Sequence, residues 1–165
     1  MNQAAALTLT SPTLERTATI AAAVAQQTRP GDLIGLIGEL GAGKTQFVRS
    51  LAAGLGLDPE QVSSPTFVLV QEYEADLPHM PVLVHIDAYR LHSDDELASL
   101  GWPELREGAV VAIEWADRVR GAMGEDWLEI VLKHAGDGRH ITLRPHGDWA
   151  DRIELLRTAL LGAAS

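Results

Sequence analysis

Residues 38–45, with the sequence GELGAGKT, combine three glycines with a lysine and a threonine in the pattern G-x-x-x-x-G-K-[ST]. The glycines let the backbone turn sharply, so that several N–H groups can face one anion at the start of a helix. In loops of this kind the lysine, here Lys44, reaches the β- and γ-phosphates of a nucleotide, and the hydroxyl, here Thr45, binds Mg²⁺. The stretch therefore predicts a phosphate-binding loop.

The segments on either side of the loop support this interpretation. An apolar strand is expected at 33–37 and an amphipathic helix at 45–57, and the motif requires that order of strand, loop and helix. The alternative is a tight turn between strand and helix, with Lys44 on the surface. On the phosphate-binding interpretation, the residues that contact the nucleotide are Glu39, Leu40, Gly41, Ala42, Gly43, Lys44 and Thr45.

Two carboxylates stand where a phosphate site would need an acidic residue for Mg²⁺. Asp87 follows the apolar stretch VLVHI, and Glu114 follows VVAI. The carboxyl ends of parallel strands are where α/β sheets place their ligands, and a lone buried carboxylate is costly unless a metal or a donor compensates it. Each acid is therefore a candidate metal ligand, and the alternative for each is a surface acid just past the strand end.

The type of nucleotide is indicated by motifs that do not occur. A GTP-hydrolysing protein would show D-x-x-G after the second strand and N-K-x-D later in the chain. Here DAYR stands at 87–90, and N-K-x-D does not occur. The sequence therefore favours ATP over GTP.

The chain around these residues predicts alternating strands and helices. Strands are expected at 33–37, 66–74, 81–87 and 108–115, a hairpin at 127–147, and helices at 11–28, 45–57, 94–107 (broken at Gly101) and 148–163. Ser11 is the expected N-cap of the first helix, with Pro12 at its first position. Apolar strands alternating with helices predict a sheet covered on both faces. We expect one α/β domain over 1–165, with a mostly parallel, mixed sheet, an antiparallel hairpin near the C-terminus and a closing helix.

The composition limits the class of protein. The chain has 165 residues, of which 46% are apolar, and it contains no cysteine, so a packed domain without disulfides or thiolate metal sites is expected. The net charge of −10 disfavours broad binding to nucleic-acid backbones. Short apolar runs and an N-terminus without a secretory pattern predict a cytoplasmic protein with no membrane partner. Five histidines lack metal-ligand spacing and are assigned to the surface or the core: His79, His85, His134, His140 and His146.

The chain resembles the TsaE family, also called YjeE, in four motifs that occur in the family's order: GELGAGKTQFVR, SSPTFVLVQEY, HIDAYRL and IEWADR. These are small bacterial P-loop ATPases of tRNA threonylcarbamoyladenosine (t6A) synthesis. The resemblance runs from about residue 11 to residue 147. Many families share the phosphate loop, but SPTF followed by DAYRL and EW is much more specific. The resemblance implies a P-loop NTPase domain with a mixed sheet that uses ATP and Mg²⁺.

The resemblance also implies roles for residues outside the phosphate loop. The stretch 64–66 (Ser-Pro-Thr) would act as a nucleotide-sensing switch near the γ-phosphate, with Thr66 binding a metal-bound or attacking water; without the resemblance, an ordinary turn before a strand is as good an interpretation. Glu114 would ligate Mg²⁺ together with Thr45, and Asp87 would either support the metal site or position water. The expected catalytic residues are Lys44, Thr66, Asp87 and Glu114.

Four further residues match positions near the nucleotide in the family. Trp115 corresponds to the tryptophan of the EW motif beside the site, and its alternative role is core filler. Arg139 falls where the family has a basic residue, although arginines at hairpin tips are usually only solvated. Ser11 and Thr13 match a segment that borders the adenine.

One position departs from the family, and two others have open roles. Glu39 stands where the family usually has Asp, but this position is a spacer, so phosphate binding is not affected. Tyr89 and Arg90 are either packing and ion-pairing residues or part of a surface that contacts a partner.

The family's role implies the partners TsaB and TsaD. TsaD, paired with TsaB, transfers the threonylcarbamoyl group from threonylcarbamoyl-AMP to adenosine 37 of tRNA. TsaE binds that pair and hydrolyses ATP so that the cycle can turn over. On this interpretation the chain contacts tRNA only through the assembled complex, and it is a weak ATPase until the pair stimulates it.

Two other functions compete with this one. A small-molecule kinase could use Arg90, Arg118 and Arg120 as lid arginines, but the sequence offers no obvious acceptor pocket. A nucleotide-sensing subunit without hydrolysis would bind ATP, and Asp87 and Glu114 would then be dispensable.

Overall fold

In the computed structural model, strands and helices alternate along most of the chain; residues 4–63, 70–74, 82–101, 104 and 106–162 are described. The strands are β1 (Leu7–Ser11), β2 (Leu33–Ile37), β3 (Val70–Tyr73), β4 (Val82–Asp87), β5 (Ala109–Glu114), β6 (Trp127–Ala135) and β7 (Gly138–His146). The helices are α1 (Leu14–Gln27), α2 (Lys44–Gly54), α3 (Asp94–Ala98) and α5 (Trp149–Arg157), with 3₁₀ helices η1 (Pro59–Gln61) and η2 (Ala116–Ala122) and a π-helical turn η3 (Thr158–Gly162).

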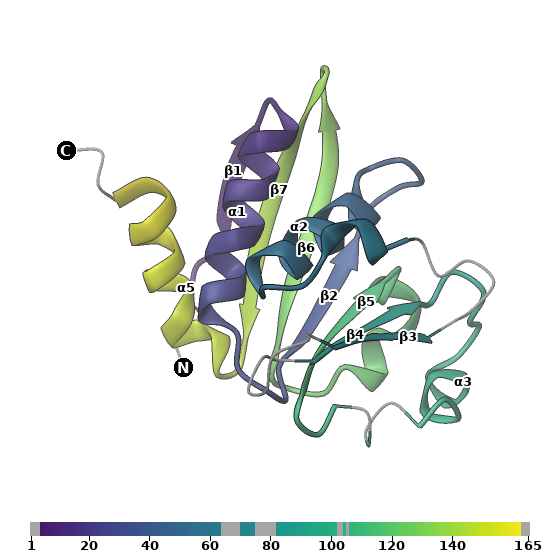
Figure 1. Cartoon of the computed structure of the whole chain (residues 1–165). Helices are drawn as coiled ribbons and strands as arrows, with labels where there is room; N and C mark the ends of the chain where they lie inside the picture. Colours follow the sequence, from purple (N-terminus) through teal and green to yellow (C-terminus); the bar gives the residue numbers. More distant parts are fainter. Residues whose placement is uncertain (1–3, 64–69, 75–81, 102–103, 105, 163–165) are drawn as a thin grey trace.

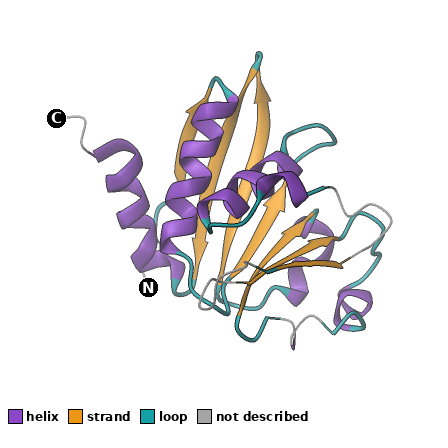
Figure 2. Ribbon diagram, in the orientation of Figure 1, coloured by secondary structure: helices purple, strands orange, loops and turns teal. Residues whose placement is uncertain are grey.

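The strands form one mixed sheet in the order β1-β7-β6-β2-β5-β4-β3. Its centre is parallel, because β2 pairs with β5 and β6, and β5 pairs with β4 in the same direction. Its two edges are antiparallel, formed by β1-β7-β6 and by β3-β4. Figures 1 and 2 show α1 and α2 across one face, α5 alongside α1, and η2 behind β5 on the other face. The predicted mixed sheet and its hairpin are confirmed.

Side-chain alternation along β2 explains the two layers. Ile34 and Leu36 point into the core shared with α1 and α2, where Phe47 is fully buried. Leu33 points to the opposite core, which η2 and α3 cover, and Ile37 packs against that core. The phosphate loop therefore begins at a strand that is fixed from both sides.

The N-terminal segment differs from the helix expected at 11–28. Strand β1 occupies Leu7–Ser11 and pairs antiparallel with β7, and α1 begins only at Leu14. The predicted N-cap is wrong: Thr13 caps α1, because its Oγ1 accepts the N–H of Arg16 at 3.1 Å. Ser11 ends β1 instead, with its Oγ 2.6 Å from Oγ1 of Thr17. The open edge of β7 offers main-chain hydrogen bonds to this segment, and local sequence preference does not register such a distant partner.

Other boundaries also differ from the expectation. Of the helix expected at 94–107, the described residues show α3 over Asp94–Ala98 and a helical residue at 104, and the closing helix changes to a π-helical turn after Arg157. Only 70–73 of the strand expected at 66–74 is described as strand, and η2 was not predicted. Within the described ranges, every helix is too short or too polar to cross a bilayer.

We predict that Phe47→Ala lowers the free energy of unfolding by about 3–5 kcal/mol, because it removes a fully buried ring and leaves a cavity under the sheet. The control is Leu155→Ala, which truncates a side chain that is 55% exposed and should change stability by less than about 0.5 kcal/mol. Urea unfolding measures both. Equal losses in the two variants would contradict this account of the core.

Candidate functional site

The loop between β2 and α2 has the backbone conformation that anion binding requires. Gly41 and Gly43 have φ angles of +79° and +104°, which residues with side chains rarely adopt. Gly43 is also the N-cap of α2, so no side chain caps the first turn of that helix. The N–H groups at this helix start are therefore available to a ligand, and the helix dipole favours an anion there.

Lys44 lies within the loop and not in open solvent. Its Nζ donates to the carbonyl oxygens of Gly38 at 2.6 Å and Glu39 at 2.8 Å. The same Nζ lies 4.0 Å from the centroid of the Trp115 ring. Burial lowers the pKa of Lys44, and the nearby carboxylates, Glu114 foremost, only partly oppose that effect. The ammonium is thus a poorly hydrated cation beside the loop, which is a suitable partner for phosphate.

The strand register brings the two predicted acids together. Asp87 of β4 pairs with Glu114 of β5, and Leu36 of β2 pairs with Glu114 from the other side. Both carboxylates are buried, with 6% and 3% of their residue surface exposed. The Oγ1 of Thr45 donates to both carboxylate oxygens of Glu114, at 2.9 and 3.1 Å. The ends of two neighbouring strands therefore meet the start of α2.

These oxygen groups fit Mg²⁺ in combination with a nucleotide. Within the described ranges, His, Asp and Glu side chains form no cluster of three or more that could enclose a metal. Mg²⁺ in nucleotide sites is commonly held by one or two side-chain oxygens together with phosphate oxygens and water. The Thr45 hydroxyl and the Glu114 carboxylate, with Asp87 next to them, provide such a donor set.

Asp87 is in an unfavourable environment for a charge. Burial raises the pKa of Asp87, the N–H of Tyr89 opposes this by donating to Oδ1 at 2.9 Å, and the charge of Glu114 raises the pKa further. Its carboxylate is thus held beside the phosphate loop with little solvation.

His85 also belongs to this group of side chains. It is fully buried, and its Nε2 lies 2.5 Å from Oε2 of Glu114. Because His85 lacks metal-ligand spacing, the sequence alone predicts only a surface or core role for it. The useful signal was strand periodicity, since His85 precedes Asp87 by two residues on β4 and so shares its face.

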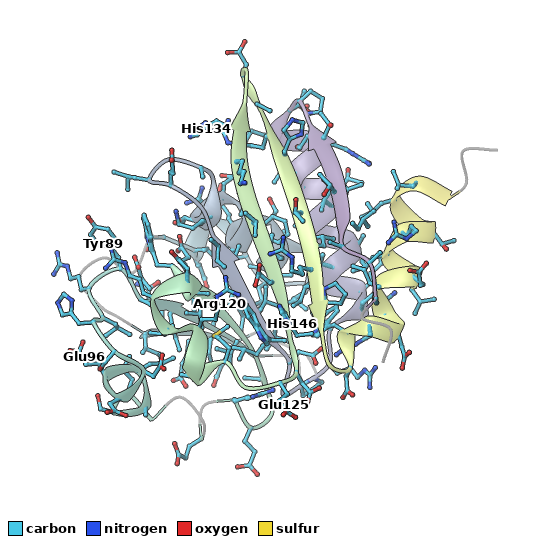
Figure 3. The ribbon with its side chains drawn as sticks, turned by 180° about the vertical axis from the view of Figure 1, so that it is seen from behind. Tyr89, Glu96, Arg120, Glu125, His134 and His146 are labelled. Atoms are coloured by element: carbon cyan, nitrogen blue, oxygen red, sulfur yellow. The ribbon has the colours of Figure 1, made fainter. Side chains whose placement is uncertain are left out.

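Trp115 forms a wall of the site and is more than core filler. Its φ is +59°, and no other non-glycine residue in the described part of the chain has a positive φ. Its ring lies 4.9 Å from that of Tyr89, and the guanidinium of Arg118 lies 5.1 Å from the Tyr89 ring. Tyr89 is 46% exposed and lies at the periphery of the molecule (Figure 3). Strained backbone of this kind is concentrated at functional sites.

Of the hollows that border the loop, two contain most of the predicted site residues. One, of about 400 Å³, is lined by the predicted residues Leu40, Gly41, Gly43, Lys44, Thr45, Asp87, Glu114 and Trp115, among others. The other, of about 220 Å³, is lined by the predicted residues Ser11, Thr13, Ala42, Gly43 and Arg139, among others. The side chain of Glu39 is exposed. Ser64, Pro65 and Thr66 lie outside the described residues.

Arg139 connects the hairpin to the phosphate loop. Its Nε donates to the carbonyl oxygen of Ala42 at 2.8 Å, and its Nη2 donates to that of Gly41 at 3.3 Å. The residue therefore supports the loop that it was expected to adjoin, and it is not merely a solvated hairpin-tip arginine.

One protein-family model matches most of the chain. The model of the family described as "Threonylcarbamoyl adenosine biosynthesis protein TsaE" matches residues 11–141. The chain belongs to the TsaE family.

Relatives along most of the chain agree with this assignment. A Bacillus subtilis (strain 168) protein is 41% identical over 145 residues, covering 86% of this chain and 85% of its own length. A Streptomyces coelicolor protein is 40% identical over 134 residues, covering 77% and 89%. Both are named "tRNA threonylcarbamoyladenosine biosynthesis protein TsaE". The resemblance drawn from the four motifs is thus confirmed.

The TsaE fold agrees with a solved structure. The crystal structure of Bacillus subtilis YdiB matches with a TM-score of 0.73 and 31% sequence identity, over all of both chains. The α/β fold class expected from the sequence is therefore confirmed.

A third buried carboxylate in this TsaE family member lies on the opposite face of the sheet. Glu129 is fully buried and accepts hydrogen bonds from Arg120 and Arg144, with His146 at 3.3 Å. Arg120 and His146 are labelled in Figure 3. Burial by itself would raise the pKa of Glu129, but the hydrogen bond and charge of Arg120, together with the charge of Arg144, leave it below its ordinary value. This cluster is therefore a stabilised ion-pair network. It includes Arg120, one of the three arginines that a kinase could use in a lid.

We predict that Asp87→Asn raises the free energy of unfolding at neutral pH. Because the pKa of Asp87 is raised in the folded state, its charged form costs stability above that pKa. The advantage of the variant should shrink as the pH falls through the raised pKa, and it should vanish below the unfolded value of about 3.9. Urea unfolding over a pH series measures the difference.

The control for this prediction is Asp137→Asn, which removes one negative charge from an exposed position at the hairpin tip. We expect Asp137→Asn to raise the free energy of unfolding at neutral pH by less than Asp87→Asn does. If the two variants gain equally, the effect comes from the net charge of the acidic chain and not from the burial of Asp87.

Proposed function

We propose that this TsaE family member hydrolyses Mg-ATP as a component of the machinery that makes threonylcarbamoyladenosine at position 37 of tRNA. The observation that carries the proposal is the contact between Thr45 at the end of the phosphate loop and Glu114 at the end of β5. The names of the relatives support the pathway. The loop and its paired acids support the chemistry.

The residues around the phosphate loop fit a nucleoside triphosphate. The N–H groups at the start of α2 would bind the phosphate oxygens, and the ammonium of Lys44 would exchange its two carbonyl partners for phosphate. Thr45 and Glu114 would hold the metal, which would supply charge neutralisation at the phosphates.

Asp87 is suited to act on water beside the metal site. Its carboxylate is buried and its pKa is raised, so it is a better proton acceptor than an exposed aspartate. In this proposal Asp87 orients the attacking water and Glu114 supports the metal. Thr66 and the rest of the expected switch keep their predicted role near the γ-phosphate.

The smaller hollow is the proposed place for the base. Ser11 and Thr13 border it from the β1–α1 connection, and Arg139 borders it from the hairpin. The guanidinium of Arg139 holds the loop carbonyls of Gly41 and Ala42, so a base bound there would contact the same structure that carries the phosphates.

The proposed partners are TsaB and TsaD. Two exposed side chains stand at the mouth of the larger hollow, Leu40 with 83% and Tyr89 with 46% exposure. A partner that covers them would lie next to the γ-phosphate position, so that loss of the γ-phosphate could be converted into a change at the interface. The net charge of −10 favours contact with tRNA only through the assembled complex.

The test is ATP hydrolysis by the purified chain, alone and with the TsaB–TsaD pair. We expect slow turnover alone and faster turnover with the pair. Lys44→Ala and Glu114→Gln should each lower the stimulated rate by about 10²–10³-fold, because Lys44→Ala removes a cation that offsets the charge of the phosphates and Glu114→Gln weakens the hold on the metal that also offsets it. The matched control is Lys133→Ala, since Lys133 is the other lysine of the chain and is exposed on β6.

Three results would oppose the proposal in different ways. Fast turnover without the pair would contradict the partner-coupled mechanism. Tight ATP binding without turnover, unaffected by Glu114→Gln, would indicate a nucleotide sensor. Transfer of phosphate to a small metabolite would indicate a kinase.

A further inference from the structure

His85 contacts the carboxylate of Glu114 inside the protein. The Nε2···Oε2 distance is 2.5 Å, and the two side chains are 0% and 4% exposed. The residues lie on the neighbouring parallel strands β4 and β5, where His85 pairs with Ala112 and Asp87 pairs with Glu114. Glu114 is therefore held from α2 by Thr45 and from β4 by His85.

The chemistry of the pair assigns the proton of the ring. An ionised carboxylate only accepts hydrogen bonds, so Nε2 of His85 is the donor to Oε2 of Glu114. Nδ1 is buried and has no hydrogen-bond partner among the described residues. Buried polar atoms that serve only to stabilise a fold are normally paired. The polar contact that the described structure gives this ring is thus directed at Glu114.

Thr45 alone does not fix how the carboxylate is turned. Its hydroxyl has one proton, and that proton is shared between the two oxygens of Glu114, at 2.9 and 3.1 Å. A bond shared in this way holds the carboxylate near the hydroxyl but leaves it free to rotate about its terminal torsion, which has a broad energy minimum. The ring of His85 is fixed by complete burial and binds one oxygen only.

We infer that His85 is a positioning residue for the metal site, which sets the orientation of the Glu114 carboxylate and thereby strengthens Mg²⁺ binding to the nucleotide complex. The inference rests on the proposed Mg-nucleotide function of the site. Hydrogen-bond partners that orient ligating side chains typically change metal affinity by about 10- to 100-fold when they are removed.

The test uses the full chain with three substitutions at His85. His85→Gln retains an N–H donor at about the reach of Nε2, His85→Asn has a similar amide that is one methylene shorter, and His85→Leu has no donor. Calorimetry measures ADP binding with and without Mg²⁺, and the ratio of the two dissociation constants is the Mg²⁺ dependence. The control is His140→Leu, which removes an exposed histidine from β7.

In the Leu and Asn variants, we expect Mg²⁺ to strengthen ADP binding about 10- to 100-fold less than it does in the wild-type chain. The affinity for ADP without Mg²⁺ should be unchanged. The Gln variant and the His140→Leu control should keep the wild-type dependence. Thermal unfolding checks that each variant is folded. If His85→Leu does not fold, the Gln and Asn variants, which are both polar, still decide the question.

Two outcomes would overturn the inference. If the Asn variant keeps the wild-type Mg²⁺ dependence, or if it loses ADP affinity equally with and without Mg²⁺, His85 is a structural residue only. If the wild-type chain binds ADP with no Mg²⁺ dependence, the proposed function fails and takes the inference with it. The first result leaves the proposed function intact, so the two failures can be told apart.

Discussion

The hydrogen bonds that reach the carboxylate of Glu114 are the constraint on which the site depends. A glutamate with only 3% of its residue surface exposed is tolerated only if its neighbours supply donors or positive charge to the carboxylate. Thr45 supplies one donor from the start of α2, and His85 supplies another from β4. Both contacts need β4, β5 and α2 in the observed register, so the arrangement of the sheet and the geometry of the phosphate loop are fixed together.

The same region concentrates groups that destabilise the folded chain. Burial lowers the pKa of Lys44 and raises that of Asp87, and the backbone of Trp115 is strained. The opposite face of the sheet contrasts with this, because Glu129 is buried with two arginines that lower its pKa. Natural proteins commonly accept local cost at functional sites. The unfavourable placement of Lys44 and Asp87 is therefore understandable if phosphates and a metal compensate it.

Much of the phosphate site could be predicted from the sequence, because the signals for it are local. The phosphate loop depends on glycine spacing, and the positions of Asp87 and Glu114 follow from where apolar strands end. Strand β1 could not be predicted in this way, because it forms on the edge of β7, more than a hundred residues away in the chain. The role of Arg139 depends likewise on the hairpin reaching back to the loop. The placement of His85 beside Asp87 follows from strand alternation along β4, whereas metal-ligand spacing gives no signal for it.

The most direct test of the account is a crystal structure of the chain with a non-hydrolysable ATP analogue and Mn²⁺, in which anomalous scattering locates the metal. We expect phosphates on the N–H groups at the start of α2, and a Mn²⁺ peak at coordination distance from Oγ1 of Thr45 beside the carboxylate of Glu114. A metal bound elsewhere, or an analogue bound away from the loop with the contacts of Thr45 and Lys44 unchanged, would contradict it.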